Sequence, residues 1–292
     1  MTSPNSAASD STTSAAGTLY VVATPIGNLG DISARAIDVL GSVAVVAAED
    51  TRYSQRLFNH LNIRCECIPY HEHSEEKTTQ RVINVLQSGQ DVALISDAGT
   101  PLISDPGFRL LRAVQECEIS VSPIPGASAL LAALSVAGLA TDSVLFDGFL
   151  PSKSAARKAR FEALSGQRQT LVFYEAPHRI AASLTDLLEV MGPNREVVLA
   201  RELTKQFETV RRDSVAKLLE WVLEDSNQQR GEIVLLVEGN KSSADEEYGE
   251  KVLQILLAEL PLKQSASLAS KISGMKKNDL YKRALEWQEK QK

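Results

Sequence analysis

The stretch Leu19-Tyr-Val-Val-Ala23, followed directly by Thr24-Pro-Ile-Gly-Asn-Leu-Gly-Asp31, decides the fold class of this chain. A short, continuous apolar run is typical of a strand that is buried on both faces, and the Gly- and Asp-containing segment after it predicts a loop. Apolar residues then recur at helical spacing from Ile32 to Leu40. A strand, a loop and a helix in this order predict the beginning of a βαβ unit.

The same order repeats along the next hundred residues. We expect further strands at 43–47, 65–68, 91–95 and 119–122, with helices between them. Buried strands that alternate with helices predict a mostly parallel sheet, and ligands bind an open sheet of this kind at the carboxyl ends of its strands. A polar loop follows every strand, and although one such loop can be only a turn, five along one edge favour a ligand site.

The fourth loop, Ser96-Asp-Ala-Gly-Thr-Pro-Leu-Ile-Ser-Asp-Pro-Gly107, has the richest chemistry. Asp97 at the strand end is a candidate functional acceptor, and Ala98 and Gly99 expose backbone to a ligand. Asp105 precedes a proline, which is the pattern of a helix cap with proline in the first turn. The sequence therefore predicts a functional Asp97 and a structural Asp105.

A second α/β unit begins near Gly126. Strands are expected at 144–146, 170–174, 196–200 and 232–237, and the alternating segment 207–212 is a candidate hairpin partner of 196–201. No Ser- or Gly-rich linker separates the two α/β units, which predicts a shared cleft. The boundaries that we predict are a disordered tail over 1–16, α/β domains over 17–125 and 126–240, and a helical extension over 241–292.

The last fifty residues have a different pattern. A helical stripe containing Val252, Leu256 and Leu260 precedes two short helices about the turn Ser273-Gly274, the outline of a helix-turn-helix. Segment 263–292 holds eight basic and three acidic residues in a chain whose net charge is -6. This asymmetry favours a phosphate-facing appendage, although a solvated helical cap remains an alternative.

Composition bounds the classes of protein. The chain has 292 residues, of which 43% are hydrophobic and 23% charged, which excludes a disordered, collagen-like or membrane-spanning chain. Its longest nearly apolar run, 129–139, is too short for a bilayer. Three cysteines cannot form a disulfide framework, and the N-terminus lacks a secretory signal. These features predict a cytoplasmic protein that does not interact with a membrane.

Eight motifs in order carry a family resemblance, and together they span about 17–239: Thr24-Pro-x-Gly-Asn-Leu-x-Asp31, Ala48-Glu-Asp-Thr-Arg52, Tyr70-His-Glu-His73, Ser96-Asp-Ala-Gly-Thr-Pro101, Asp105-Pro-Gly107, Pro125-Gly-Ala-Ser128, Tyr174-Glu-Ala-Pro-His-Arg179 and Ala200-Arg-Glu-Leu-Thr-Lys205. They resemble the tetrapyrrole methylase superfamily of S-adenosylmethionine-dependent enzymes. Their wording is most similar to its ribosomal RNA branch, which methylates the 2'-oxygen of a cytidine in 16S rRNA. The first and fourth loops lack the Gly-rich and Gly-Asp-Pro forms of the corrin and siroheme methylases, which favours RNA over a tetrapyrrole.

The resemblance implies an α/β fold of two α/β domains with the methyl donor in the cleft between them, and a homodimer. It implies these donor-binding positions: Pro25, Gly27, Asn28, Asp97, Ala98, Gly99, Thr100, Ser128, Ala129, Tyr174, Ala200 and Gly231. Candidate catalytic residues are Glu49, Asp50, Arg52 and Lys205, where Glu49 or Asp50 is a candidate base and the alternative is an acid–arginine pair that only braces its loop.

Candidate RNA-binding residues are basic and lie near the expected cleft, along 153–160 and in the C-terminal segment: His71, Arg157, Lys158, Arg160, His178, Arg179, Lys276, Lys277, Lys282 and Arg283. Phosphate contacts position an RNA, while a base is recognised in a pocket. Only 5% of the residues are aromatic, so a stacking platform is not predicted; Tyr53, Tyr70 and Tyr174 are the aromatic candidates.

Two alternatives to an enzyme acting on 16S rRNA or the small ribosomal subunit remain open. One is a methyltransferase of a tetrapyrrole or other small molecule, which would have no use for a basic tail. The other is a ligand-sensing, nucleic-acid-binding regulator without catalysis. His71 and His73, with Cys65, Cys67 and His60 nearby, lack the usual ligand spacing of zinc sites, and no metal is predicted.

Overall fold

The computed structural model describes residues 15–71, 75–241 and 244–290. These residues form two compact units, Met1–Glu238 and Gly239–Lys292, and each is described by itself. The predicted tail over 1–16 lies almost wholly outside the described residues. The domain boundaries at 125/126 and 240/241 stay predictions, although the division between the compact units falls at Glu238, two residues before the second of them.

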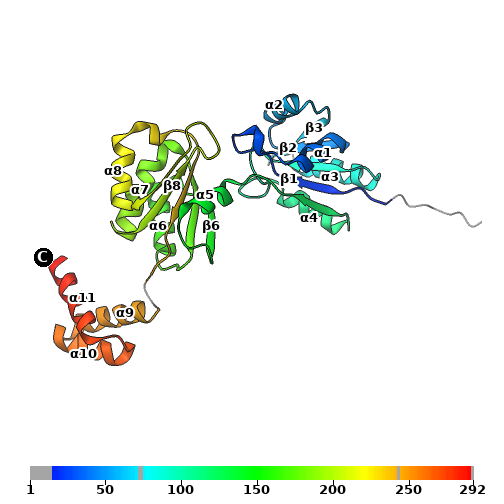
Figure 1. The fold of residues 1–292 in the computed structure, drawn as a ribbon. Helices are drawn as coiled ribbons and strands as arrows, with labels where there is room; N and C mark the ends of the chain where they lie inside the picture. The colour runs from blue at the N-terminus through cyan, green and yellow to red at the C-terminus, as the bar shows by residue number, and fades with distance from the viewer. Residues whose placement is uncertain (1–14, 72–74, 242–243, 291–292) are drawn as a thin grey trace, which may run out of the picture. The chain divides into compact units, whose positions relative to one another are not determined.

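The N-terminal half of the first unit contains a five-stranded sheet. Its strands are β1 (Leu19–Val22), β2 (Val45–Ala48), β3 (Glu66–Pro69), β4 (Val92–Ile95) and β5 (Val121–Ile124). They lie in the order β3-β2-β4-β1-β5, and every neighbouring pair is parallel. Figure 1 labels β1, β2 and β3 of this sheet. The parallel sheet expected from the apolar runs is therefore confirmed, with its carboxyl ends along one edge.

Helices cover both faces of this sheet. They are α1 (Ala34–Ser42), α2 (Thr51–Leu61), α3 (Glu75–Gln87) and α4 (Phe108–Glu116), with a 3-10 turn, η1 (Leu29–Asp31), in the first loop. Alternate residues of each strand enter different clusters: Val45 and Leu94 pack with α3 and α4, whereas Val46 and Ile95 pack with α1 and α2. Burial on both faces explains why these strands are continuously apolar.

The C-terminal half of the first unit contains a second five-stranded sheet. Its strands are β6 (Val144–Phe149), β7 (Thr170–Glu175), β8 (Glu196–Arg201), β9 (Thr209–Ser214) and β10 (Ile233–Val237), in the order β6-β7-β10-β8-β9. Only β6 and β7 are parallel; β10 is antiparallel to both of its neighbours, and β8 and β9 form the predicted hairpin. The second sheet is therefore mixed, because helix-and-strand alternation does not fix where β10 inserts.

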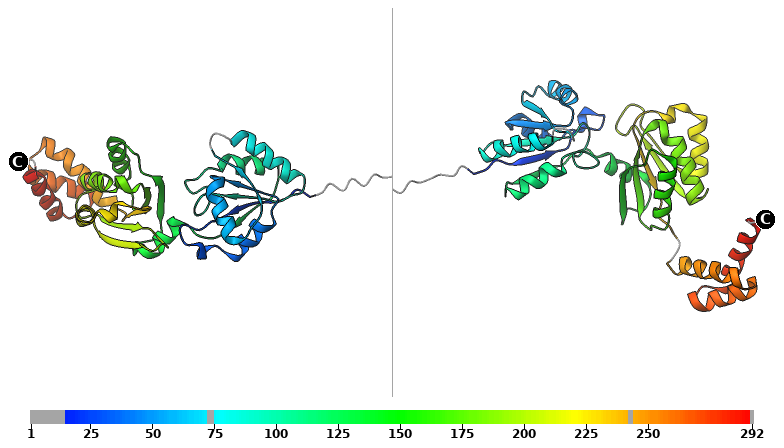
Figure 2. Two further views of the ribbon diagram at one scale, coloured as in Figure 1. Left: turned by 90° about the horizontal axis from the view of Figure 1, so that it is seen from above. Right: turned by 180° about the vertical axis from the view of Figure 1, so that it is seen from behind.

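The helices around the second sheet also form two layers. One face is packed by α6 (Ser154–Leu164), α7 (Ile180–Met191) and α8 (Val215–Glu224), and the other by α5 (Ala129–Ala137) (Figure 2). This half of the unit also contains the short 3-10 turns η2 (Pro177–Arg179) and η3 (Ser226–Gln229). Ile26, from the loop after β1, is buried in the α5-side cluster with Val234 and Leu203. Apolar burial therefore links the first loop to the second sheet.

The C-terminal unit consists of three helices: α9 (Ala244–Glu259), α10 (Leu262–Ser273) and α11 (Lys277–Lys290). Gly274 ends α10 in the left-handed conformation, with φ of 77°, as the predicted turn requires. The small core contains Leu253, Ala269 and Leu280. The predicted helix–turn–helix outline is confirmed. No helix of the described residues is long and apolar enough to cross a membrane.

Candidate active site

A cavity of about 380 Å³ lies within the first unit, at the carboxyl-end loops of the parallel sheet and beside the second sheet. Its wall combines Ile26 of the first loop, residues 98–100 and 103–105 of the fourth loop, and Ser128 and Ala129 at the start of α5. The second sheet contributes Phe149, residues 174–177 and residues 231–234, among others. The size and mostly apolar lining are those of a small-molecule site.

Most of the predicted donor-binding residues come together in this wall: Ala98, Gly99, Thr100, Ser128, Ala129, Tyr174, Ala200 and Gly231. The remaining four do not line it. Pro25 is buried, and Gly27 and Asn28 lie in the exposed part of the first loop, where Asn28 accepts a hydrogen bond from the Gly30 N–H at 3.0 Å. Asp97 accepts from the Asp50 N–H at 3.0 Å, and so joins the second and fourth loops.

Two glycines in these loops are closely covered by neighbouring side chains. Gly231, with φ of 81°, would place a Cβ 2.4 Å from Cδ of Glu202. Gly27, with φ of 146°, would place one 2.4 Å from Cγ of Lys205. Both positions favour glycine because of their positive φ, and a side chain there would also require Glu202 or Lys205 to move. The loop after β8 therefore packs closely on the first loop and on the backbone of the cavity wall.

Backbone strain is concentrated in the loops beside the cavity. Leu102 and Ser104 of the fourth loop have φ of 75° and 71°, and Glu202 and Thr204 of the loop after β8 have φ of 51° and 66°. Positive φ is costly for residues other than glycine, and such conformations gather where function over-determines the backbone. The strain supports assigning this cavity as the functional site.

Carboxylates gather where the second and fourth loops meet. The Asp97 N–H donates to Glu49 Oε2 at 3.4 Å. Burial raises the pKa of Glu49 despite this hydrogen bond, and the nearby Asp97 and Asp105 charges add to the increase. Burial also raises the pKa of Asp97 and of Asp105. A carboxylate with a raised pKa is a stronger proton acceptor, which suits a base.

Asp50 and Arg52 form a different kind of pair. Asp50 is the N-cap of α2, and its carboxylate accepts from the Arg52 backbone N–H at 2.8 Å and from its guanidinium. Hydrogen bonds from Arg52 lower the pKa of Asp50 to about 2. The low pKa makes Asp50 a weak proton acceptor, and the geometry matches the alternative of a pair that braces its loop.

Lys205 lies between two acidic side chains. Its Nζ is 2.9 Å from Glu202 Oε1 and 3.1 Å from Glu232 Oε2. Burial disfavours the charged ammonium, but the hydrogen bonds to Glu202 and Glu232 outweigh burial and raise the pKa of Lys205. A cation held in this way is a poor base, so Lys205 is better placed to close the loop over Gly27 and Gly231 than to accept a proton.

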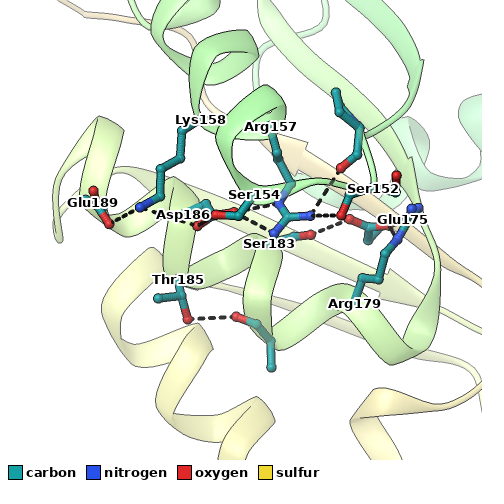
Figure 3. A network of polar contacts seen from close by, with 12 residues as sticks. Ser152, Ser154, Arg157, Lys158, Glu175, Arg179, Ser183, Thr185, Asp186 and Glu189 are labelled. Atoms are coloured by element: carbon teal, nitrogen blue, oxygen red, sulfur yellow. Dashed lines mark hydrogen bonds and ion pairs between the residues drawn. The ribbon is translucent and has the colours of Figure 1, made fainter.

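Arg157, predicted to contact RNA, is buried instead. Its side chain is 3% exposed and forms an ion pair with Asp186 at 2.5 Å, and its Nη1 donates to the carbonyls of Pro151 and Ser152 (Figure 3). Ser154 donates to the same Asp186 at 2.8 Å. The sequence pattern places Arg157 on a basic segment but cannot show which face of α6 packs on α7. We leave Arg157 out of the RNA-facing set.

Other predicted RNA-binding residues of the first unit keep some exposure. The ammonium of Lys158 pairs with Glu189 at 2.5 Å, and Arg160 pairs with Asp147. Arg179 pairs with the buried carboxylate of Glu175 at 2.6 Å, so its guanidinium also holds the strand end beside the cavity (Figure 3). His71 and His178 are exposed.

In the C-terminal unit, Lys276, Lys277 and Lys282 are exposed, whereas Arg283 is half-buried and pairs with Glu250. Of the proposed aromatic candidates, Tyr53 is exposed, Tyr174 lines the cavity and Tyr70 is buried in the core. Across the described residues, no three His, Cys, Asp or Glu side chains gather as a metal site would require. His73 lies outside the described residues.

The structure adds cavity residues that the sequence analysis missed. Asp105 lines the wall, and Gly107, not Asp105, is the N-cap of α4, so the cap prediction for Asp105 is wrong. Phe149 lines the wall from the end of β6. Leu203 lay inside the quoted motif 200–205, but its burial against Ile26 depends on tertiary contact. Motif position was a signal for Asp105 and Leu203, whereas Phe149 lies outside the motifs.

Comparisons with known proteins decide the family. The family model described as "Tetrapyrrole (Corrin/Porphyrin) Methylases" matches residues 18–219, and the "RsmI C-terminal HTH domain" matches residues 242–288. A protein of Pseudomonas aeruginosa named "Ribosomal RNA small subunit methyltransferase I" is 56% identical, over 94% of this chain and 99% of its own length. The chain belongs to the tetrapyrrole methylase family, in the branch named ribosomal RNA small subunit methyltransferase I. The Escherichia coli O157:H7 protein of the same name is 48% identical, over 93% of the chain and 96% of its own length.

Solved structures support the fold alone. A uroporphyrin-III-C-methyltransferase from Thermus thermophilus has a TM-score of 0.55 at 23% identity, covering 76% of this chain and 94% of its own. A diphthine synthase has a TM-score of 0.56 at 13% identity, covering 76% and 90%. The predicted fold of this family member, two α/β domains with a C-terminal helical segment, is thereby confirmed.

Proposed function

We propose that this family member transfers a methyl group from S-adenosylmethionine to the 2'-oxygen of a cytidine in 16S rRNA of the small ribosomal subunit. The observation that carries the proposal is family membership over nearly the full chain, together with the cavity at the carboxyl ends of a parallel sheet. The relatives at 48–56% identity are named for methylating small-subunit ribosomal RNA, whereas the uroporphyrin-III-C-methyltransferase is 23% identical.

The chemistry of the cavity fits a sulfonium donor. Its described lining contains no Lys, Arg or His, whereas the Asp105 carboxylate lies in the wall. A positively charged sulfonium with an apolar adenosine is matched by this combination of carboxylate, apolar side chains and exposed backbone. When bound, S-adenosylmethionine supplies an electrophilic methyl group on a positively charged sulfur. Ala98, Gly99, Ser128 and Tyr174 would hold it.

The chain's own residues have to orient the ribose and accept a proton. The donor would supply the methyl carbon to which the 2'-oxygen bonds, and the hydroxyl proton would pass to a base of the chain. We assign that base to Glu49, since its raised pKa favours proton acceptance while Asp50 is held at about 2. Glu49 does not line the cavity, but its carboxylate accepts from Asp97, the neighbour of wall residue Ala98.

The proposal includes exposed basic residues as phosphate contacts, a cytoplasmic location and a homodimer. Lys276, Lys277 and Lys282 are exposed in a unit that matches a helix-turn-helix family model, which supports nucleic-acid contact. Leu131 and Val136 of the apolar helix α5 are 64% and 53% exposed, which supports burial in a dimer. Analytical ultracentrifugation tests the dimer directly.

The function is tested by incubating the full chain with methyl-labelled donor and either naked 16S rRNA or assembled small subunits. We expect label on one cytidine, resistant to alkaline cleavage because a 2'-O-methyl blocks attack on the neighbouring phosphate. Uroporphyrinogen is the control acceptor. Label on the tetrapyrrole and not on RNA would support the small-molecule alternative, and binding to nucleic acid without any transfer would support a regulator.

A further inference from the structure

We propose that Phe149 is the platform on which the target nucleobase stacks while its ribose enters the cavity. This inference rests on the proposed function, because it assumes that the acceptor is a nucleotide. Among the described residues, Phe149 and Tyr174 are the two aromatic side chains in the cavity wall. Phe149 is 60% exposed, an unusual state for a large apolar ring that also borders a pocket.

The Phe149 ring is supported from behind by other aromatic rings. Its centroid is 5.4 Å from that of Tyr174, at an interplanar angle of 67°. Tyr174 in turn meets Phe146 edge-on at 5.0 Å. Edge-to-face pairs of this kind are favourable and restrict ring motion. Contact with Tyr174 therefore holds one side of the Phe149 ring in place. The rest of the ring is exposed to solvent beside the cavity.

The backbone before Phe149 is built to change the direction of the strand. The β6–β7 register shifts between Phe146 and Phe149, and Gly148 has φ of 70°. A Cβ at Gly148 would lie 3.3 Å from Oγ of Ser104, a wall residue of the fourth loop. Bulges redirect side chains and are common beside active sites. Here the irregularity brings Phe149 to the cavity, where a regular strand would continue past it.

Exposed basic side chains close to Phe149 in the sequence favour a nucleotide over an apolar partner. Asp147 pairs with Arg160, whose side chain remains 43% exposed. Lys153 is also exposed, at the start of the basic helix α6. Recognition of unpaired RNA combines basic side chains for phosphate with aromatic rings for the base. An exposed ring, a basic neighbourhood and an adjoining cavity together match that combination.

Three substitutions separate stacking from other roles of this ring. Phe149→Leu keeps apolar volume but loses the aromatic face, Phe149→Ala loses both, and Phe149→Trp keeps an aromatic face. Phe207→Leu is the matched control, because Phe207 is 65% exposed and does not line the cavity. For each variant, kcat and KM are measured with small subunits, and the Kd of S-adenosylmethionine is measured by calorimetry without RNA.

We expect Phe149→Ala and Phe149→Leu to lower kcat/KM for RNA by about 10-fold or more, as alanine substitution of stacking residues does. Phe149→Trp should stay within about 3-fold of the unmodified chain, and its added indole fluorescence should be quenched by RNA but not by donor. The donor Kd should stay within about 2-fold in all variants, and so should RNA kinetics in Phe207→Leu.

Other outcomes would overturn the inference. A weakened donor Kd with unchanged RNA kinetics would place Phe149 against the donor. A shift from dimer to monomer in sedimentation would make it an interface residue, and a fully active Phe149→Leu would remove any need for an aromatic face. Failure of the proposed function is separately visible, because the unmodified chain would then transfer no label to RNA.

Discussion

Arg157→Ala distinguishes a folding role from an RNA-binding role for the basic segment of α6. Arg157 is 3% and Asp186 7% exposed, and their contacts are the 2.5 Å ion pair and the 2.8 Å bond from Arg157 Nε to Asp186 Oδ2 (Figure 3). Removing Arg157 leaves the buried Asp186 carboxylate with the Ser154 hydrogen bond and with the partly exposed Lys158 ammonium, whose Nζ is 3.8 Å away. Breaking a buried pair of this kind costs about 3–5 kcal/mol of the free energy of unfolding.

The expected loss translates into a clear thermal shift. For a domain of roughly 150–250 residues, each kcal/mol moves Tm by about 2–4 °C, so Arg157→Ala should lower it by about 6–20 °C. Differential scanning calorimetry and urea unfolding measure the change. The control is Arg160→Ala, whose pair with Asp147 is partly exposed and should contribute less than about 1 kcal/mol.

Two further results test whether Arg157 has a structural role. The double variant Arg157→Met with Asp186→Leu should recover much of the lost stability, because it removes both buried charges at once. At a temperature where all variants are folded, Arg157→Ala should bind small subunits as tightly as the unmodified chain. An unchanged Tm together with weaker RNA binding would refute the structural role of Arg157.

Three other perturbations follow from the cavity and its surroundings. Gly231→Val should weaken donor binding by at least about 10-fold, because its Cβ would meet Glu202 at 2.4 Å. The control is Gly192→Ala, which has a similar φ of 82° and no atom within 4 Å of the added Cβ, and which should leave donor binding unchanged. Isothermal calorimetry compares the two variants. Transfer activity should fall as pH decreases through the raised pKa of Glu49, above 4.5. Glu49→Gln should lose most of the activity and also this decrease at acidic pH. A Glu49→Gln variant with an unchanged pH profile would remove Glu49 as the base. Iodoacetamide should modify exposed Cys117 well before Cys67, since burial raises the pKa of Cys67 to about 11; mass spectrometry of the peptides would contradict this if Cys67 reacted first.

Local pattern was sufficient for much of the fold. The continuous apolar strands predicted a parallel first sheet because burial on both faces leaves no room for polar alternation. The local pattern also located the β8–β9 hairpin and the turn at Gly274. The position of β10 between β7 and β8 could not be predicted, because strand order depends on long-range pairing that leaves no local signature.

The candidate site also contains some residues that the sequence identified and others whose roles it could not distinguish. Motifs identified loop residues such as Gly99 and Ser128, and loop position suggested Gly231, because a ligand that approaches backbone requires small residues at fixed places. They could not distinguish Glu49 from Asp50, since the difference in pKa arises from burial on one side and a helix cap with Arg52 on the other.

The sequence by itself determined the family, the polar loops along one sheet edge and the helical C-terminal segment, because each depends on residue types at fixed spacing. Only the tertiary structure decided that Arg157 is buried, that Asp105 and Phe149 line the cavity, and that Lys205 is held between two carboxylates. Burial, charge pairing and the direction of a side chain result from contacts between distant segments, and no local pattern encodes them.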